Sequence, residues 1–282
     1  GKYDSALADI DKVNEIRPPH MYSEFIRARI LLHLNKNLEH KVALKNAYTL
    51  MRGYDRKVLS RNLQLLYLAG LISYALNNHQ DAYNYLSEYV AKKPFNSNAQ
   101  TVLASILIAQ NKVKEAIEQL TTARAVAPDN PHIPRLLGMA YVKIGDFRRA
   151  ATTFENAITK TAKASSLHSL LAMSKVGLNK RNDAIIGLQS ALETEPNARR
   201  AGLMLGLLLL QEKRYPEVLV LANGILKKEP DNAVVHNMKS VALWGSGDTD
   251  SALISAKRSV ALRPNYVLAR SNLAKIELSL GN

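Results

Sequence analysis

Five prolines stand on one 34-residue grid, and this spacing limits the possible folds more than any other feature of the chain. They are Pro94, Pro128, Pro196, Pro230 and Pro264. Proline has no backbone N–H and its ring clashes with the preceding helical turn, so we expect each one to stop a helix. The grid point without proline is Ala162. An Asp or Asn often follows, and such residues favour turns and can cap the next helix. They are Asp129, Asn130, Asn197, Asp231, Asn232 and Asn265.

One unit of this grid is complete between residues 135 and 158. Its signature covers two helices and the turn between them: Leu137, Gly138, Tyr141, Gly145, Asp146, Ala150, Phe154 and Ala157. Small residues allow two helix backbones to approach, and the aromatic residues fill the space between neighbouring helix pairs. The pattern resembles the tetratricopeptide repeat (TPR), a 34-residue pair of antiparallel helices. The resemblance implies an all-α fold, a right-handed TPR superhelix (α-solenoid) of antiparallel helix pairs.

The grid divides the chain into four segments. Residues 1–19 match the second helix of a truncated repeat, and residues 267–282 match the first helix of another. Residues 63–266 predict six regular 34-residue units. Residues 20–62 predict an irregular helix pair with an insertion near 52–62, because Pro18 and Pro94 are 76 residues apart, eight more than two 34-residue repeats. Both ends then fall inside repeats, so we expect the chain to be a slice of a longer protein.

Composition narrows the classes of function. The chain carries a net charge of +14, only 6% aromatic residues and no cysteine. A basic surface attracts anions of many kinds. The Lys and Arg residues recur at helix ends and turns, however, where solvated cations are also stabilised by the negative end of the helix dipole. Without cysteine there is no disulfide, cysteine-ligated metal or cysteine nucleophile. The longest apolar run, 203–210, is far shorter than the ~20 residues of a membrane span.

The sequence contains no recognisable catalytic or metal motif. None of the seven histidines has HExxH or other metal-ligand spacing. The run Gly245-Ser246-Gly247 lacks the following Lys-Ser/Thr of a phosphate loop. We therefore expect no enzyme active site, no metal site and no cofactor within this chain. These observations do not exclude a catalytic domain elsewhere in the full protein.

The TPR resemblance implies that first helices line a concave face and bind peptides or helices of partner proteins. Mapping the family's inward positions onto this chain predicts a partner-binding set: Tyr67, Tyr74, Asn98, Thr101, His132, Arg135, Met139, Lys143, Met173, Arg200, Leu207, Asn237 and Trp244. Methionine surfaces adapt to varied apolar ligands, and arginine can bind a carboxylate by paired hydrogen bonds. The alternatives are that the apolar members pack between neighbouring helices, that the arginines are merely solvated, and that Trp244 packs under a glycine turn.

Members of the family that bind chaperone tails use a Lys/Asn carboxylate clamp. Its asparagine positions are held here mostly by apolar residues, namely Val102, Leu136, Leu170, Met204 and Met238. The resemblance therefore does not predict binding of chaperone tails.

The second half is similar to one bacterial subgroup, the long TPR lipoproteins of the PEP-CTERM/exosortase system. The stretches that carry the similarity are 131–158, 170–196 and 205–232. It implies a periplasmic or outer-membrane-anchored scaffold connected with exopolysaccharide export and surface-protein sorting. The family's lipid-bearing cysteine is absent from this chain, which leaves localisation open.

We expect a non-catalytic scaffold that binds a protein or peptide segment in its concave groove. One alternative is a basic surface that binds an anionic polymer, with polysaccharide favoured over nucleic acid, because few aromatic residues are present to stack on bases. Another is a TPR region that presents substrates to a catalytic domain outside the chain. The sequence leaves the oligomeric state undetermined.

Overall fold

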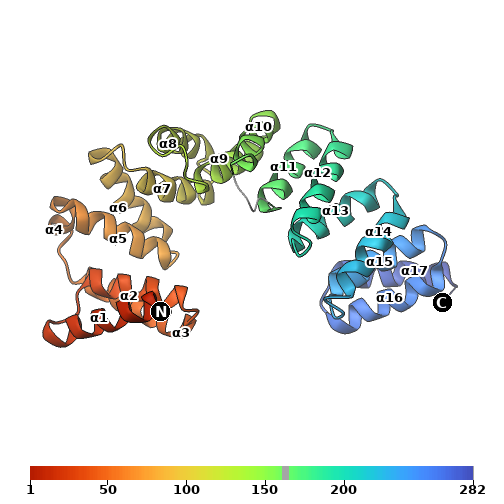
Figure 1. Ribbon diagram of the computed structural model, residues 1–282, viewed down its shortest axis with the longest axis horizontal. Coiled ribbons are helices and arrows are strands. Elements are labelled where there is room, and N and C mark those ends of the chain that lie inside the picture. Colours follow the sequence, from red (N-terminus) through yellow and green to blue (C-terminus); the bar gives the residue numbers. More distant parts are fainter. Residues whose placement is uncertain (161–164, 282) are drawn as a thin grey trace. The chain divides into compact units, whose positions relative to one another are not determined.

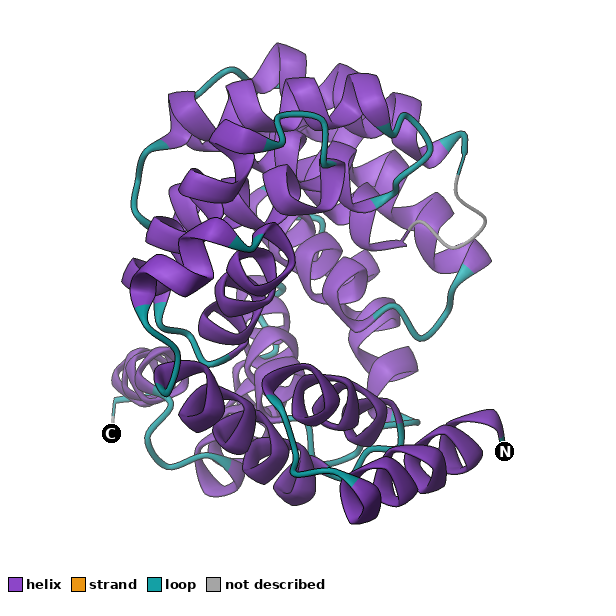
Figure 2. Ribbon diagram, turned by 90° about the vertical axis from the view of Figure 1, so that its left-hand side faces the viewer, coloured by secondary structure: helices purple, strands orange, loops and turns teal. Residues whose placement is uncertain are grey.

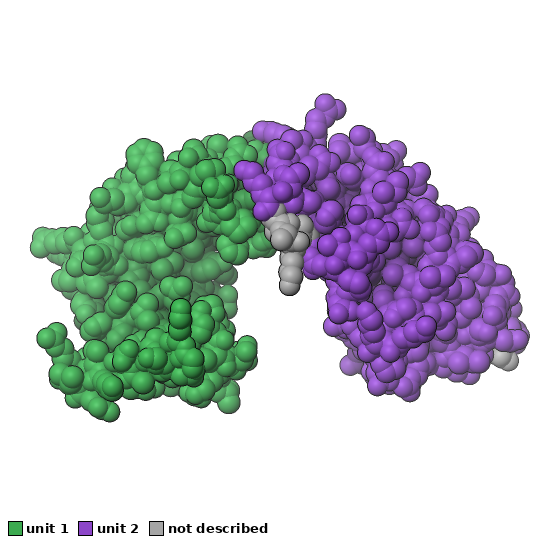
Figure 3. All heavy atoms as spheres, in the orientation of Figure 1, with its two compact units in different colours: residues 1–144 green, residues 145–282 purple. Residues whose placement is uncertain are grey.

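The computed structural model describes residues 1–160 and 165–281, and within them the chain is all helix, with short loops and no strand (Figure 2). The predicted all-α fold is confirmed. The grid point Ala162 lies outside the described residues. The chain divides into two compact units, Gly1–Ile144 and Gly145–Asn282 (Figure 3), and each is described by itself.

The first unit holds nine helices in its described residues (Figure 1). They are α1 (Lys2–Ile16), α2 (Met21–His33), α3 (Asn37–Arg52), α4 (Arg56–Arg61), α5 (Leu63–Ala75), α6 (His79–Lys92), α7 (Ser97–Ala109), α8 (Val113–Val126) and α9 (His132–Lys143). Consecutive helices pack as hairpins, with α2 against α3, α5 against α6 and α7 against α8.

The second unit continues the same alternation of helices. Its described part contains α10 (Phe147–Ile158), α11 (Ser165–Gly177), α12 (Arg181–Thr194), α13 (Arg199–Gln211), α14 (Tyr215–Leu226), α15 (Ala233–Gly245), α16 (Thr249–Leu262) and α17 (Val267–Ser279). From α5 to α16, each pair of a first and a second helix begins about 34 residues after the previous pair, which is the spacing of the proline grid.

The turn inside each pair uses one left-handed residue. The residues with positive φ lie 34 apart from Asn77 onward: Asn35, Asn77, Asn111, Gly145, Asn179, Lys213, Gly247 and Gly281. Glycine and asparagine adopt this conformation with little strain, which explains their use. The predicted turn at 145–146 is confirmed, because Gly145 has φ +78° and the Asp146 carboxylate accepts a hydrogen bond from Arg149 N–H at 3.0 Å.

The grid prolines stop the second helices as predicted. Helices α6, α8, α12 and α16 each end two residues before their proline, whereas α14 ends earlier, at Leu226. Capping by the following Asx residues is only partly correct. Asn232 caps α15, but the N-cap positions of α13 and α17 are Ala198 and Tyr266, without side-chain bonds. Asn197 and Asn265 stand one residue too early in the chain to cap these helices.

The irregular segment of the first unit contains a short extra helix, α4. Its Leu59 side chain is 2% exposed and belongs to the same core cluster as Phe25 of α2, Leu44 of α3 and Leu68 of α5. The Arg56 guanidinium also lies 2.6 Å from the Glu88 carboxylate of α6. The insertion is therefore packed into the core of the unit.

Candidate functional site

First helices of successive repeats contact each other within each unit. In the first unit α5 contacts α7 and α7 contacts α9, while in the second α11, α13, α15 and α17 form a similar row. The thirteen predicted partner-binding residues all lie on helices of these two rows. We call these thirteen residues the first-helix face.

None of the thirteen residues is buried. Helix α13 shows how this arises, since Gly202, Leu205 and Leu209 face the core, while Arg200 and Leu207 do not. Core residues recur every three to four positions along such a helix, which leaves the other side accessible. The side chain of Leu207 is 55% exposed and that of Met173 is 37% exposed. The face is therefore open to a partner on the helices of each unit.

In the first unit, aromatic side chains line one end of the face. The ring of Tyr67 stacks on Tyr89 with centroids 4.8 Å apart, and Tyr74 lies beside His79 at 6.3 Å. Burial raises the pKa of Tyr67 and the neighbouring Tyr89 adds to the rise, while the charge of Arg29 opposes it. The positive charge of Arg29 on α2 therefore acts on the Tyr67 hydroxyl.

Three polar side chains of the face on α7 and α9 already have contacts within the protein. The Thr101 hydroxyl donates to the Ser97 carbonyl of its own helix at 2.6 Å. The Lys143 ammonium donates to the carbonyl of Ile108 at 2.9 Å, where it offsets the negative end of α7. Arg135 is half-buried, and its guanidinium contacts the Met139 sulfur at 3.9 Å. The other two members on these helices, Asn98 and His132, are exposed.

In the second unit the face combines apolar side chains with one cation. Met173 and Leu207 are exposed, and Arg200 is exposed without a hydrogen bond or ion pair among the described residues. The Asn237 amide oxygen accepts a hydrogen bond from Asn272 at 2.9 Å. Trp244 is half-buried and packs against a small core cluster of α16 and α17, which favours its interpretation as a packed aromatic.

The positions of the chaperone-tail clamp are occupied by packing residues. Leu170 and Met238 are each 5% exposed, and Val102, Leu136 and Met204 are partly buried. These side chains are apolar, so they present no amide to a carboxylate.

The mapping from sequence named no residue on α2, although this helix also exposes apolar side chains. Tyr22 and Leu32 are 60% and 50% exposed, and Arg29 lies near Tyr67 as described above. Helix α2 has the same length as α5 and starts 42 residues earlier, a full repeat plus the insertion. The 42-residue offset between α2 and α5 could have been obtained from the sequence by assigning the eight extra residues to α4 and its flanking turns.

The described residues offer no metal centre and no membrane span. No group of three or more His, Asp or Glu side chains among them could hold an ion, and none of their helices is long and apolar enough to cross a bilayer. Burial lowers the pKa of His168, and the charge of Lys175 acts in the same direction. Its Nδ1 is buried without a partner among the described atoms, which is the environment of a packed neutral imidazole.

Comparison with known families agrees with this architecture. A family model described as tetratricopeptide repeat matches residues 73–136 and 107–173. The curated DnaJ homolog subfamily C member 3 of Gallus gallus is 23% identical in an alignment of 256 residues that covers 82% of this chain. The chain spans about half the length of that relative, 50% of its sequence.

Solved structures show the same fold at low sequence identity. YrrB, described as a TPR protein with an unusual peptide-binding site, is 19% identical, with a TM-score of 0.52 over 66% of this chain and 96% of its own. A tetratricopeptide repeat protein from Parabacteroides merdae is 12% identical, with a TM-score of 0.61 over 91% of this chain and 98% of its own. Together the comparisons support the tetratricopeptide-repeat family and do not confirm the PEP-CTERM/exosortase subgroup.

Proposed function

We propose that this tetratricopeptide-repeat solenoid is a non-catalytic scaffold that binds an extended segment of a partner protein along the first helices of a unit. The observation that carries the proposal is that none of the thirteen predicted residues is buried and that six are exposed, on helices whose other sides are buried: Asn98, His132, Lys143, Met173, Arg200 and Leu207. A face held by packed helices is ordered before binding, so association requires little further ordering of the scaffold.

The chemistry of the face in the second unit indicates what the segment carries. Exposed Met173 and Leu207 favour apolar side chains of the partner, because contact removes apolar surface from water. The flexible thioether of Met173 also adapts to varied shapes. Arg200, exposed and without an ion-pair partner among described residues, favours a carboxylate bound by paired hydrogen bonds. A segment of mixed apolar and acidic residues fits both features.

The comparisons support the class of ligand. TPR proteins bind protein or peptide partners, and YrrB is described as having a peptide-binding site. The resemblance of residues 131–158, 170–196 and 205–232 to TPR lipoproteins of the PEP-CTERM/exosortase system suggests a partner in bacterial exopolysaccharide export or surface-protein sorting. We propose this setting on the sequence resemblance alone.

The absence of cysteine allows a direct test by site-specific crosslinking. Single cysteines would replace Met173 and Leu207 on the face, and matched cysteines would replace Ile186 and Ile254 on second helices, where the side chains are 64% and 71% exposed. Each variant would carry a photoactivatable maleimide and be irradiated in an extract of the organism that encodes the chain.

The proposal expects Met173→Cys and Leu207→Cys to label the same partner and the two second-helix variants to leave it unlabelled. Arg200→Glu should weaken capture of that partner, whereas Lys257→Glu, an equal change of charge on α16, should not. Equal labelling from both sets of positions would show that the first helices are not the binding surface.

A further inference from the structure

A pocket opens between the two helices of the repeat formed by α13 and α14. Its volume is about 610 Å³, within the range typical of ligand pockets. Its apolar walls come from the end of α12, the first turns of α13 and the second half of α14: Leu192, Pro196, Gly202, Leu203, Val220, Leu221, Gly224 and Ile225. None of the thirteen residues of the first-helix face lines it, so this is a separate surface.

The sequence explains why the space is empty in this repeat. Gly202 occupies a grid position that the other regular repeats fill with a larger side chain: Leu66, Gln100, Pro134, His168 and His236. Leu66 is fully buried, Gln100 is 2% exposed and the other three residues are half-buried, so a side chain at this position occupies space inside the repeat. Gly224 on the facing helix has nothing within 4 Å of where a Cβ would stand. Two missing side chains therefore open the pocket.

Helix α14 is rich in apolar residues, but few of them are buried by other helices. Its sequence, YPEVLVLANGIL, is apolar on nearly every side, yet only Val218 and Ala222 are buried. Val220, at the edge of the pocket, is 75% exposed. A second cavity of about 350 Å³ shares Val220 and Leu221 with the first. A helix that is apolar all round is normally buried, and exposed apolar surface of this kind marks an interaction site.

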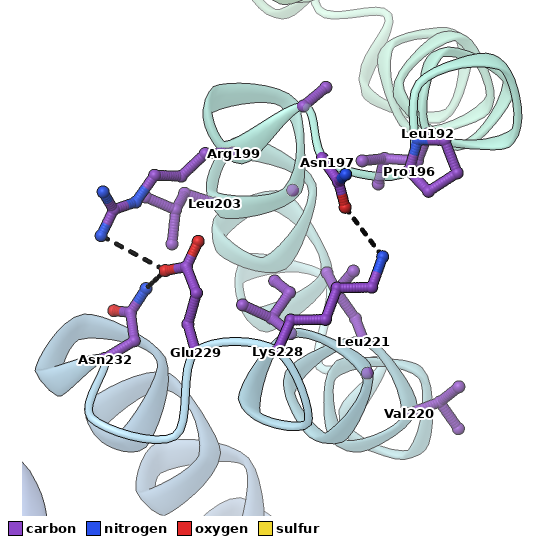
Figure 4. Close-up of a pocket in the computed structure, with 14 residues that line it drawn as sticks. Leu192, Pro196, Asn197, Arg199, Leu203, Val220, Leu221, Lys228, Glu229 and Asn232 are labelled. Atoms are coloured by element: carbon purple, nitrogen blue, oxygen red, sulfur yellow. Dashed lines mark hydrogen bonds and ion pairs between the residues drawn. The ribbon is translucent and has the colours of Figure 1, made fainter.

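The rim of the pocket is polar and carries an excess of positive charge (Figure 4). Arg199 and the buried Asn232 both reach the Glu229 carboxylate, at 3.3 and 2.6 Å. On the other side of the opening the Lys228 ammonium donates to the amide oxygen of Asn197 at 2.8 Å. That partner is neutral, so the charge of Lys228 is not compensated. Two polar bridges thus cross a space with an apolar floor.

We propose that this pocket binds an acidic peptide segment of a partner protein, which inserts bulky apolar side chains between α13 and α14 and places a carboxylate on Lys228. The apolar walls supply the space that Gly202 and Gly224 leave open. The cation without a carboxylate partner supplies the charge complementarity, because replacing a neutral amide acceptor by a carboxylate strengthens the hydrogen bond. The same α14 surface then becomes covered.

The test uses the full chain and a defined probe. A short fluorescein-labelled peptide with a Phe-Leu pair flanked by glutamates would be titrated by fluorescence polarisation, beside versions with Ala-Ala or with flanking lysines. Gly202→Leu should fill the pocket, because a Cβ there would stand at ordinary contact distance, 3.4 Å from Ile225 and 3.9 Å from Leu192. Gly224→Leu fills the pocket from the other wall, and thermal melting would show which filled variants fold.

The proposal expects the Phe-Leu peptide with glutamates to bind best and a folded pocket-filling variant to lose at least about tenfold in affinity. Lys228→Gln should lose about three- to tenfold, while Lys227→Gln, a matched loss of charge on a residue that does not line the pocket, should bind as wild type. On peptide binding, hydrogen exchange should slow in α14 and not in α16.

Three results would overturn the proposal. One is equal binding of the peptide by wild type and by a folded pocket-filling variant. Another is equal loss of affinity in Lys227→Gln and Lys228→Gln, which would indicate diffuse charge attraction. The third is no peptide binding by a chain that dimerises through this surface, seen as self-association lost in Gly202→Leu. Variants of the first-helix face leave the pocket intact, so the two proposals fail separately.

Discussion

Two aromatic side chains at the start of second helices lie directly over glycines at the end of the next first helix. A Cβ on Gly177 would stand 2.4 Å from the Phe147 ring, and one on Gly245 would stand 2.4 Å from the Tyr215 ring. Both pairs are separated by 30 residues, so the same contact recurs two repeats apart. Glycine is needed at these positions because the ring occupies the volume of a methyl group.

We therefore predict that Gly177→Ala and Gly245→Ala each lower the free energy of unfolding by about 1–3 kcal/mol, the usual cost of overpacking a core. Gly187→Ala in α12 is the matched control, since nothing lies within 4 Å of its Cβ. The control should raise stability by up to about 1 kcal/mol through helix propensity. Urea unfolding followed by circular dichroism gives all three values, and equal effects at the three glycines would contradict the packing argument.

The left-handed turn position allows a second prediction at the residue scale. Lys213 has φ +56°, at a point where the equivalent residues of the other turns are asparagine or glycine. A side chain with a Cβ is strained in this region by roughly 1–2 kcal/mol. Lys213→Gly should therefore raise the melting temperature, and Gly247→Ala at the equivalent turn should lower it. A lower melting temperature for Lys213→Gly would show that the lysine side chain has a stabilising contact there.

At the scale of elements, one carboxylate of α6 accepts hydrogen bonds from side chains of α4, beside the apolar packing of Leu59. Glu88 of α6 lies 2.6 Å from Arg56, 2.9 Å from Lys92 and 3.3 Å from the Ser60 hydroxyl. Hydrogen bonds from Lys92, then from Arg56 and Ser60, lower the pKa of Glu88. Because the folded-state pKa is depressed, this stabilisation is present above the ordinary value of 4.5 and is lost as pH falls through the folded pKa.

We predict that Glu88→Gln lowers the free energy of unfolding at pH 7 by up to about 1 kcal/mol, the usual range for partly exposed ion pairs. The difference from wild type should shrink as pH falls below the ordinary carboxyl range. Glu118→Gln, an exposed residue on α8 with no ion pair among the described residues, serves as the control. A difference that stays constant from pH 7 into acid would exclude the carboxylate network as its cause.

The sequence predicted the elements better than it predicted the surfaces between them. The proline grid located the ends of the second helices, and the Gly145 turn was correct, because both follow from backbone chemistry that acts locally. Capping by Asn197 was wrong, since capping depends on a register of one residue. The pocket beside Gly202 depends on how the helices pack around a missing side chain, and the 34-residue spacing does not encode that packing.

At the scale of the whole chain, the basic excess is shared equally by the two compact units. Several cations are already paired, as in Arg56–Glu88, Arg199–Glu229 and Arg258–Asp231. The remaining positive charges are spread along the whole sequence and are not concentrated on one helix. Distributed charges of this kind attract polyanions through long-range fields, and salt screens these fields over a Debye length of about 10 Å at 0.1 M and about 3 Å at 1 M.

We therefore predict that heparin, used as a test polyanion, is retained at low salt and released steeply as salt rises. Arg200→Glu and Lys257→Glu should reduce heparin binding equally and slightly, because each removes the same charge from a distributed field. Binding of a partner segment should instead persist at high salt, since apolar burial at Met173 and Leu207 is not screened, and it should be weakened by Arg200→Glu but not by Lys257→Glu. Heparin binding that survives high salt and is abolished by one substitution would establish a discrete polyanion site and favour the anionic-polymer alternative.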